Sequence, residues 1–126
     1  MSWNDLTLNP KVVLGYFNQP PSIDRIEIYR LVLNRDASCL EIVFEPSTFP
    51  ENPSPKWPVG SNTVQITLRT IGISQLELNG WSNNIFGSLS ISKVDGAISL
   101  AFEGQIKLKV ICSYLDVTKV SGYCKG

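Results

Sequence analysis

The feature that most constrains the fold of this chain is the alternation of apolar and polar residues with a period of two from Ile26 onward. In one such run, Val64, Ile66 and Leu68 are separated by single polar residues. Successive side chains of a β-strand point to opposite faces, so each run predicts a strand with one face toward a core and the other toward water. We expect about seven or eight strands. The runs cover residues 26–33, 40–45, 64–69, 75–79, 88–92, 98–103, 106–110 and 115–117.

The connections between these runs favour hairpins. Asp95-Gly96 stands between two alternating runs, which is a strong signal for a two-residue turn. Gly104 separates the run that ends at Glu103 from the next one, and residues 34–38 fit a hairpin loop. No helical pattern intervenes between the runs. We therefore predict a mainly β fold, an antiparallel meander that forms a sandwich or an open barrel.

A single short helix is expected near the N-terminus. Asn9 and Pro10 predict its start. An asparagine side chain can accept hydrogen bonds from the first backbone N–H groups, and proline at the first helical position has no N–H to leave unpaired. Val13, Tyr16 and Phe17 then fall on one face at spacings of three and four. A helix this short depends on docking for its stability.

The composition indicates one globular domain that covers residues 1–126. A chain of 126 residues can bury a core without disulfides or metals. Its 11 basic and 11 acidic residues cancel. No overall field therefore favours nucleic acid or an anionic membrane, and we expect neither as a partner. No apolar run approaches the roughly 18 residues of a membrane span, and the start of the chain lacks the layout of a secretory signal.

The three cysteines, Cys39, Cys112 and Cys124, suit a reducing compartment. Their odd number and the lack of a close pair argue against a disulfide scaffold. The sequence leaves open whether Cys112 and Cys124 lie close enough to pair. Together with the missing secretory signal, these cysteines predict a cytoplasmic protein.

The absence of histidine narrows the chemistry that the chain can perform. Histidine is the commonest general base, the usual partner of serine and cysteine nucleophiles, and the commonest metal ligand. The sequence also has no metal-ligand spacing, no calcium loop and no phosphate-binding glycine loop. We therefore expect no metal and no cofactor, and we predict that the chain is not an enzyme.

One rival hypothesis is a histidine-free enzyme that uses glutamates on its strands. Two carboxylates on neighbouring strands would form an acid/base pair if one of them had a raised pKa. Each of these glutamates occupies a polar position in an alternating run, where a solvated carboxylate is the ordinary outcome. The residues are Glu27, Glu41, Glu45, Glu77 and Glu103.

Two connections carry tryptophan residues. Residues 46–60 contain five prolines, which exclude a strand or helix interior, and connections of this length in compact domains are often functional. This connection holds Phe49 and Trp57. The second connection, NGWSNN at 79–84, has the polar composition of a turn. It nevertheless carries Trp81, a large apolar side chain. Tryptophan is enriched at the centres of interfaces and is equally suited to plug a core.

Several segments, taken in order, carry a resemblance to a known family. They are WNDLTLNPKVVLGYF (3–17), PPSIDRIEIYRLVLNRD (20–36), FPENPSPKWPVGSNTVQITL (49–68), LELNGWSNN (76–84) and SGYC (121–124). Together they resemble the Imm50 family of bacterial immunity proteins, which are partners of polymorphic toxins. The resemblance implies a cytosolic protein that is encoded beside a toxin gene, binds the toxin domain and has no catalytic activity of its own.

The resemblance supplies no contact residues, so the expected toxin-binding surface rests on the side chains alone. We predict that Trp57 and Trp81 act as anchors, that Asn83 and Asn84 give polar specificity, and that Glu51 lies on the rim. Exposed sheet edges would also allow a homodimer. The alternative is a small β-sandwich module that binds a sugar or a peptide in an aromatic-lined cleft and has no toxin partner.

Overall fold

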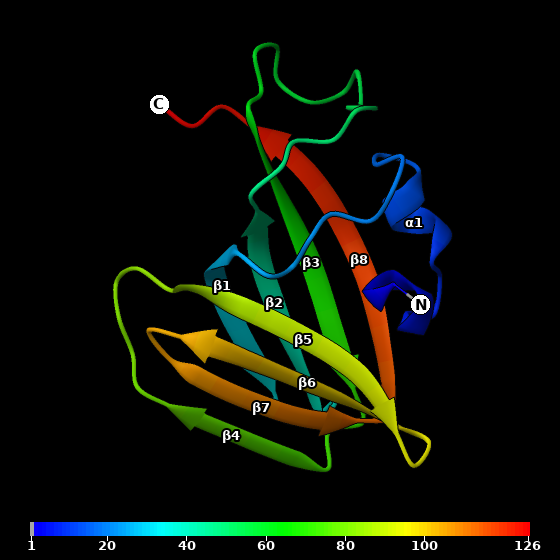
Figure 1. Cartoon of the computed structure of the whole chain (residues 1–126), viewed down its shortest axis with the longest axis vertical. Helices are drawn as coiled ribbons and strands as arrows, with labels where there is room; N and C mark the ends of the chain where they lie inside the picture. The colour runs from blue at the N-terminus through cyan, green and yellow to red at the C-terminus, as the bar shows by residue number, and fades with distance from the viewer. Residues whose placement is uncertain (1) are drawn as a thin grey trace.

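In a computed structural model of the chain, which describes residues 2–126, the strands form one antiparallel sheet (Figure 1). Within these residues eight strands follow one another in the order β4-β7-β6-β5-β1-β2-β3-β8. This confirms the mainly β, antiparallel class with a short N-terminal helix, and the sheet is open. The strands are β1 (Ile26–Asn34), β2 (Cys39–Pro46), β3 (Thr63–Ile71), β4 (Gln75–Asn79), β5 (Phe86–Val94), β6 (Ala97–Gly104), β7 (Lys107–Cys112) and β8 (Tyr114–Tyr123).

The sheet folds over on itself at the junction of β1 and β5. These two strands share only two paired positions, Ile26 with Gly87 and Glu27 with Phe86. In the view of Figure 1, β5, β6, β7 and β4 cross in front of β1, β2, β3 and β8. Because β7 contacts β3 and β6 contacts β8, the two halves of one sheet pack face to face.

The apolar faces of the two halves enclose the core. β3 shows the predicted alternation most clearly, because Val64, Ile66 and Leu68 are buried while the residues between them are half-exposed. From the other half, Leu100 and Phe102 on β6 are fully buried in the same cluster. Removing one such side chain from water stabilises the fold by about 1.5–3 kcal/mol, so this core is the main source of stability.

Two glycines permit a close approach of β5 and β6 beside the junction. Gly87 on β5 faces Gly104 on β6 in the strand register. A Cβ atom on either residue would overlap the other strand, since it would meet the backbone carbonyl of Glu103 or of Phe86. Glycine at both positions therefore lets the strands come together where β5 also pairs with β1.

The N-terminal segment contains two single-turn helices. They are the 3-10 helix η1 (Trp3–Leu6) and the α-helix α1 (Lys11–Leu14). The expected cap is wrong in detail, because Pro10 and not Asn9 occupies the N-cap position, and no side chain caps the helix. No helix within residues 2–126 is long and apolar enough to cross a membrane.

Docking onto the sheet holds this segment in place. The side chains of Val13 and Phe17 are 0% and 2% exposed, as the predicted apolar face requires. The backbone N–H of Leu8 donates to the carbonyl oxygen of Leu115 at 2.8 Å, so the segment also pairs with β8. Figure 1 shows α1 beside β8, at one side of the sheet. The helix is thus stabilised by burial, since a single turn has little stability by itself.

All three cysteines are free thiols. Cys39 and Cys112 are buried at the ends of β2 and β7, whereas Cys124 is exposed just beyond β8. Burial raises the pKa of the Cys112 thiol, and backbone hydrogen bonds at Ile71 and Tyr114 only partly oppose that shift. Cys112 is therefore a neutral, buried side chain at neutral pH.

Candidate functional site

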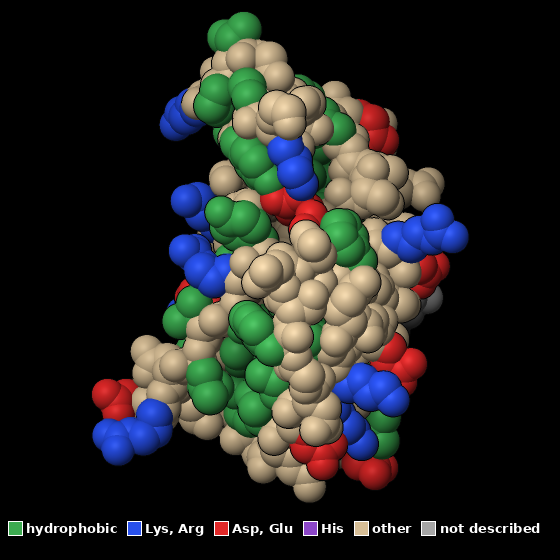
Figure 2. Space-filling view, turned by 90° about the vertical axis from the view of Figure 1, so that its left-hand side faces the viewer, with side chains coloured by type: hydrophobic (Ala, Val, Ile, Leu, Met, Phe, Trp, Pro, Cys, Tyr) green, Lys and Arg blue, Asp and Glu red, His purple; other side chains and the backbone are tan. Residues whose placement is uncertain are grey.

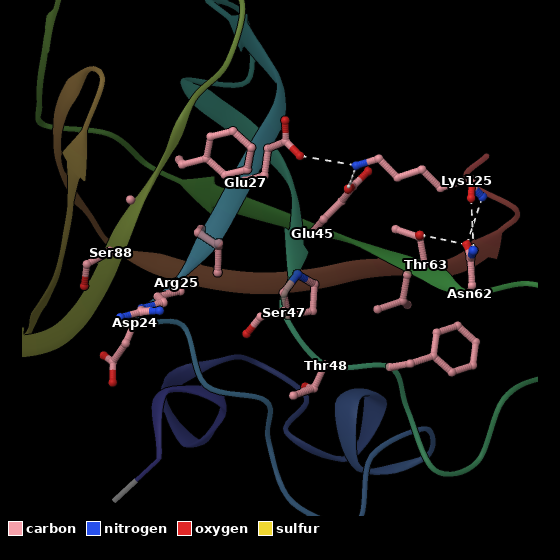
Figure 3. A pocket seen from close by; sticks show the side chains of 16 residues that line it. Asp24, Arg25, Glu27, Glu45, Ser47, Thr48, Asn62, Thr63, Ser88 and Lys125 are labelled. Carbon is pink, nitrogen blue, oxygen red and sulfur yellow. Dashed lines mark hydrogen bonds and ion pairs between the residues drawn. The ribbon is translucent and has the colours of Figure 1, made fainter.

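A cavity of about 590 Å³ opens beside the β1–β5 junction. Five separate parts of the chain line it, which places it where the two halves of the sheet and the C-terminus meet (Figure 3). We refer to it as the junction cavity. Its lining consists of residues 24–27, 45–49, 62–64 and 86–88 together with Lys125.

Two carboxylates and one ammonium group form an ion-paired triad in the junction cavity. Glu27 on β1 and Glu45 on β2 are directly opposite each other in the strand register. The Nζ atom of Lys125 lies 3.1 Å from Oε1 of Glu45 and 3.4 Å from Oε1 of Glu27. Like charges at opposed positions of an antiparallel pair repel each other, so the shared ammonium group compensates both carboxylates.

Glu45 is the best-connected member of this triad. Its Oε2 atom accepts hydrogen bonds from the Gln65 side-chain amide at 3.0 Å and from the Tyr123 hydroxyl. A carboxylate can accept several such bonds, and each stabilises its charged form. With Lys125 on Oε1, both oxygens of Glu45 are engaged.

The expectation of a solvated carboxylate is wrong for Glu45, which is only 6% exposed. The reason is its position on β2, which has neighbours on both sides and is buried on both faces over most of its length. A polar position in an alternating run places the side chain on the sheet face away from the core. At Glu45 that face is covered by Tyr123 and Lys125, so the carboxylate is not solvated.

The end of the chain is held over the cavity by Asn62. Its side-chain oxygen accepts from the backbone N–H of Lys125 at 2.8 Å, and its amide donates to the backbone carbonyl of the same residue at 3.0 Å. The hydrogen bond and charge of Glu45, followed by the charge of Glu27, raise the pKa of the Lys125 ammonium group. Lys125 is therefore fully charged at neutral pH.

The triad already holds one positively charged group. Both carboxylates share the ammonium group of Lys125. Nowhere in the described chain do three or more histidine, cysteine, aspartate or glutamate side chains gather in a group that could hold a metal ion. Charge-assisted hydrogen bonds to paired carboxylates are a means of recognising positive charge.

Aromatic side chains form part of the cavity walls. Phe49 and Phe86 both line it, and Phe86 is 50% exposed. The Phe49 ring meets the ring of Trp57 edge to face, with centroids 6.1 Å apart. Two further charged residues, Asp24 and Arg25, are exposed at the opening. The cavity thus combines flat apolar surface with charged groups, as ligand and partner sites commonly do.

Of the predicted contact residues, Trp57 and Glu51 lie in the proline-rich connection between β2 and β3. Trp57 is half-buried, and its ring stacks on that of Tyr16 with centroids 5.2 Å apart and planes 9° from parallel. It also packs on Gly122 of β8. Glu51 is exposed and accepts a hydrogen bond from the backbone N–H of Asn18 at 3.4 Å. Trp57 therefore pins this loop to the N-terminal segment and to β8.

The other predicted residues lie in the loop between β4 and β5. Trp81 is 64% exposed, and Asn83 and Asn84 are exposed as well. In Figure 1 this loop runs along the left-hand side of the molecule, whereas the proline-rich loop lies at the top. The structure therefore does not bring the five predicted residues together in one cluster.

The junction cavity nevertheless lies between the two predicted loops. Phe86 follows the β4–β5 loop directly and lines the cavity, while Phe49 belongs to the proline-rich loop and lines it too. Glu27 and Glu45 are among the five strand glutamates considered above as a possible carboxylate pair, but only the strand register shows that these two are neighbours. Lys125 was not predicted as their partner.

One edge of β1 is also open near the cavity. In the part of the chain that the structure describes, pairing of β1 with β5 stops at Glu27, and the β1 residues from Tyr29 to Asn34 have no strand on that side. Tyr29 and Leu33 on this stretch are 65% and 62% exposed. Figure 2, which looks at the left-hand side of Figure 1, shows patches of hydrophobic side chains with acidic and basic groups between them.

Comparison with known protein families identifies the chain. The model of the Imm50 family, described as immunity protein 50, matches residues 9–123. The chain belongs to the Imm50 family. Membership in this immunity protein family implies neutralisation of a toxin and a cognate toxin partner, and proteins of this kind are typically not catalysts. No curated protein and no solved structure matches this Imm50 chain.

Proposed function

We propose that this Imm50 chain neutralises its cognate toxin by forming a stoichiometric complex with the toxin domain, without chemistry of its own. The family match over residues 9–123 carries this proposal. The absence of histidine and the ion pairing of the two cavity glutamates support a binding role over an acid/base role. The site of action is the cytoplasm of the cell that makes the toxin.

The proposed toxin-binding surface is the face around the junction cavity. It combines the exposed Trp81 loop, Phe86, and the open edge of β1 with Tyr29 and Leu33. Such a surface offers aromatic anchors with polar groups around them, the usual arrangement at interface centres. Effective neutralisation needs about nanomolar affinity, roughly −12 kcal/mol, and an interface of about 800 Å² per partner can supply it.

Net charge plays no part in the proposed recognition. The 11 basic and 11 acidic residues cancel, so long-range steering must come from local groups. The charged groups at the junction cavity are the clearest local arrangement of that kind. Mutating them is therefore the direct test of which face binds.

A co-expression survival assay tests the proposed function. The toxin domain encoded beside this gene is expressed with and without the Imm50 chain, and growth is measured. We expect rescued growth and co-purification of the two proteins at a ratio of one to one. Toxin killing that continues despite soluble Imm50 chain would refute the proposal.

A second candidate function is a small-ligand module that binds a sugar or a peptide. The observation that favours it is the junction cavity, with two phenylalanine rings and converging polar groups. Thermal-shift measurements with monosaccharides and short peptides, without any toxin, test this alternative. A saturable rise in Tm for one compound class would support it, and a flat response across the panel would leave toxin binding as the proposed function.

A further inference from the structure

We propose that the junction cavity receives a lysine or arginine side chain of the toxin, which takes the place that Lys125 occupies in the free protein. This inference rests on the proposed function and specifies how the toxin is recognised. In the free protein, the Lys125 ammonium group occupies the position that the basic group of the toxin would take in the complex. Figure 3 shows the Lys125 side chain reaching across the cavity to the two carboxylates from the end of the chain.

The two carboxylates need a nearby positive charge that offsets their mutual repulsion. Glu27 and Glu45 face each other across β1 and β2, and their side chains are only 23% and 6% exposed. Two carboxylates in such positions repel each other and have lost much of their hydration. A cation must therefore compensate them whether it comes from this chain or from a partner.

Lys125 is suited to give up this position. It lies beyond the end of β8, and its side chain is 53% exposed. Among residues 2–126, its backbone is held by the two hydrogen bonds to Asn62. An incoming basic side chain would restore the ion pairs to Glu27 and Glu45, so the exchange leaves both carboxylates compensated.

An arginine side chain fits the carboxylate pair at least as well as Lys125 does. Its planar guanidinium group has five N–H donors and can bond two carboxylate groups at once, whereas an ammonium group is a compact point charge. The alkyl part of either basic side chain would lie against Phe49 and Phe86 on the cavity walls. A volume of about 590 Å³ leaves room for such a side chain.

The charge balance around the cavity also favours a cation. Its lining includes three acidic residues, Asp24, Glu27 and Glu45, and two basic residues, Arg25 and Lys125. Moving the Lys125 side chain away leaves Arg25, which is exposed at the opening, as the one basic residue among those lining residues. The site then has two uncompensated negative charges, and the complementary partner surface is basic.

The position of the cavity favours a protein as the source of the cation. The opening lies between the proline-rich loop and the β4–β5 loop with its exposed Trp81. The open β1 edge, with the apolar side chains of Tyr29 and Leu33, is continuous in sequence with Glu27. A basic side chain entering the cavity would bring the surrounding toxin surface onto these residues at the same time.

The first experiment uses butylguanidine as a probe and needs no toxin. The probe is titrated into the wild-type chain and into Lys125→Ala, and binding is followed by NMR at the backbone amides of Thr63 and Gly87, which line the cavity. We expect Lys125→Ala to bind at least about tenfold more tightly than the wild type, because the competing ammonium group is gone. The double variant Glu27→Gln/Lys125→Ala should lose the binding. A Lys125→Ala variant that shows no saturable shifts overturns the inference.

The second experiment measures the dissociation constant of the complex with the toxin domain encoded beside the gene. Glu27→Gln should weaken the complex at least about tenfold, and Glu77→Gln is the matched control, since Glu77 is an exposed strand glutamate on β4 that does not line the cavity. Glu27 is chosen because Glu45 is so deeply buried that its variants risk misfolding. Circular dichroism verifies that both variants are folded.

The outcomes separate this inference from the proposed function. If the wild type rescues growth but Glu27→Gln binds the toxin as tightly as Glu77→Gln, the inference is overturned and the proposed function stands. If butylguanidine binds while the toxin complex is insensitive to Glu27, the cavity serves a small cationic ligand and the inference is again overturned. If the wild type neither rescues growth nor binds the toxin, the inference and the proposed function are both refuted.

Discussion

The indole ring of Trp57 lies directly on the backbone of Gly122, so a Cβ atom at position 122 would lie 2.6 Å from the ring atom Cδ2. Gly122 lies on the edge strand β8 and pairs with Val64 of β3. We expect Gly122→Ala to displace Trp57 and to lower the free energy of unfolding by about 1–3 kcal/mol, the usual cost of overpacking. Guanidinium denaturation followed by circular dichroism measures this loss.

The matched control for that variant is Gly15→Ala. Gly15 ends α1 with a φ of −69°, and an added Cβ would make only an ordinary contact at 3.5 Å with the Val12 carbonyl. Its stability should be unchanged or slightly higher, because alanine restricts the unfolded chain more than glycine does. Equal losses for the two variants would show that Trp57 does not depend on the close approach at Gly122.

Trp57 and Trp81 are expected to respond differently to replacement by alanine. Trp57→Ala removes the stacked contact with Tyr16 and should cost about 2 kcal/mol of unfolding free energy, less than the roughly 3–5 kcal/mol of a fully buried aromatic side chain. Trp81→Ala should change stability by less than about 0.5 kcal/mol, because Trp81 is 64% exposed. Denaturation curves of the two variants, recorded under identical conditions, decide this.

The same Trp81→Ala variant also tests the toxin-binding surface. It should weaken the complex with the toxin domain while the fold survives, as an interface anchor would. Wild-type affinity in a folded Trp81→Ala protein would remove the β4–β5 loop from the surface. Unfolding of this variant would instead assign Trp81 to the structure of the loop.

The strands could be predicted from the sequence because the pattern that identifies each strand lies within its own residues. The alternation of Val64, Ile66 and Leu68 with polar residues needs no knowledge of the rest of the chain, and the turn at Asp95-Gly96 is encoded by its own two residues. Strand order was not predictable in this way. The placement of β1 between β5 and β2, and of β4 at the far edge, depends on which pairing buries the most apolar surface.

The carboxylate pair shows why the candidate site was harder to predict. Glu27 and Glu45 are neighbours only because of the register of β1 on β2, and that register shifts at a bulge between Ile28 and Arg30. Their cation comes from Lys125, 80 residues beyond Glu45 in sequence. Trp57 and Trp81 were predictable as conspicuous loop residues, but only the structure shows that one is packed and the other exposed.

The three thiols should differ in reactivity. At pH 8 in the native state, a thiol reagent such as Ellman's reagent should modify Cys124 only, because Cys124 is exposed whereas Cys39 and Cys112 are 6% and 2% exposed. All three should react after denaturation in guanidinium chloride. Cys124→Ser should leave no rapidly reacting thiol in the native protein. Rapid reaction of more than one thiol per native chain would contradict the packing at the ends of β2 and β7.

The contribution of Lys125 to stability should disappear at high pH. Because Glu45 and Glu27 raise the pKa of this ammonium group above its ordinary value of 10.5, its stabilising effect is fully present below that value and is lost as pH rises through the higher pKa of the folded state. The Tm difference between the wild type and Lys125→Gln should therefore stay constant from pH 7 to about pH 10 and shrink above it. The two proteins differ in no other ionisable group, so the comparison is directed at Lys125. A Tm difference that persists unchanged at pH values above this raised pKa would show that the Lys125 side chain stabilises the fold through contacts other than its charge.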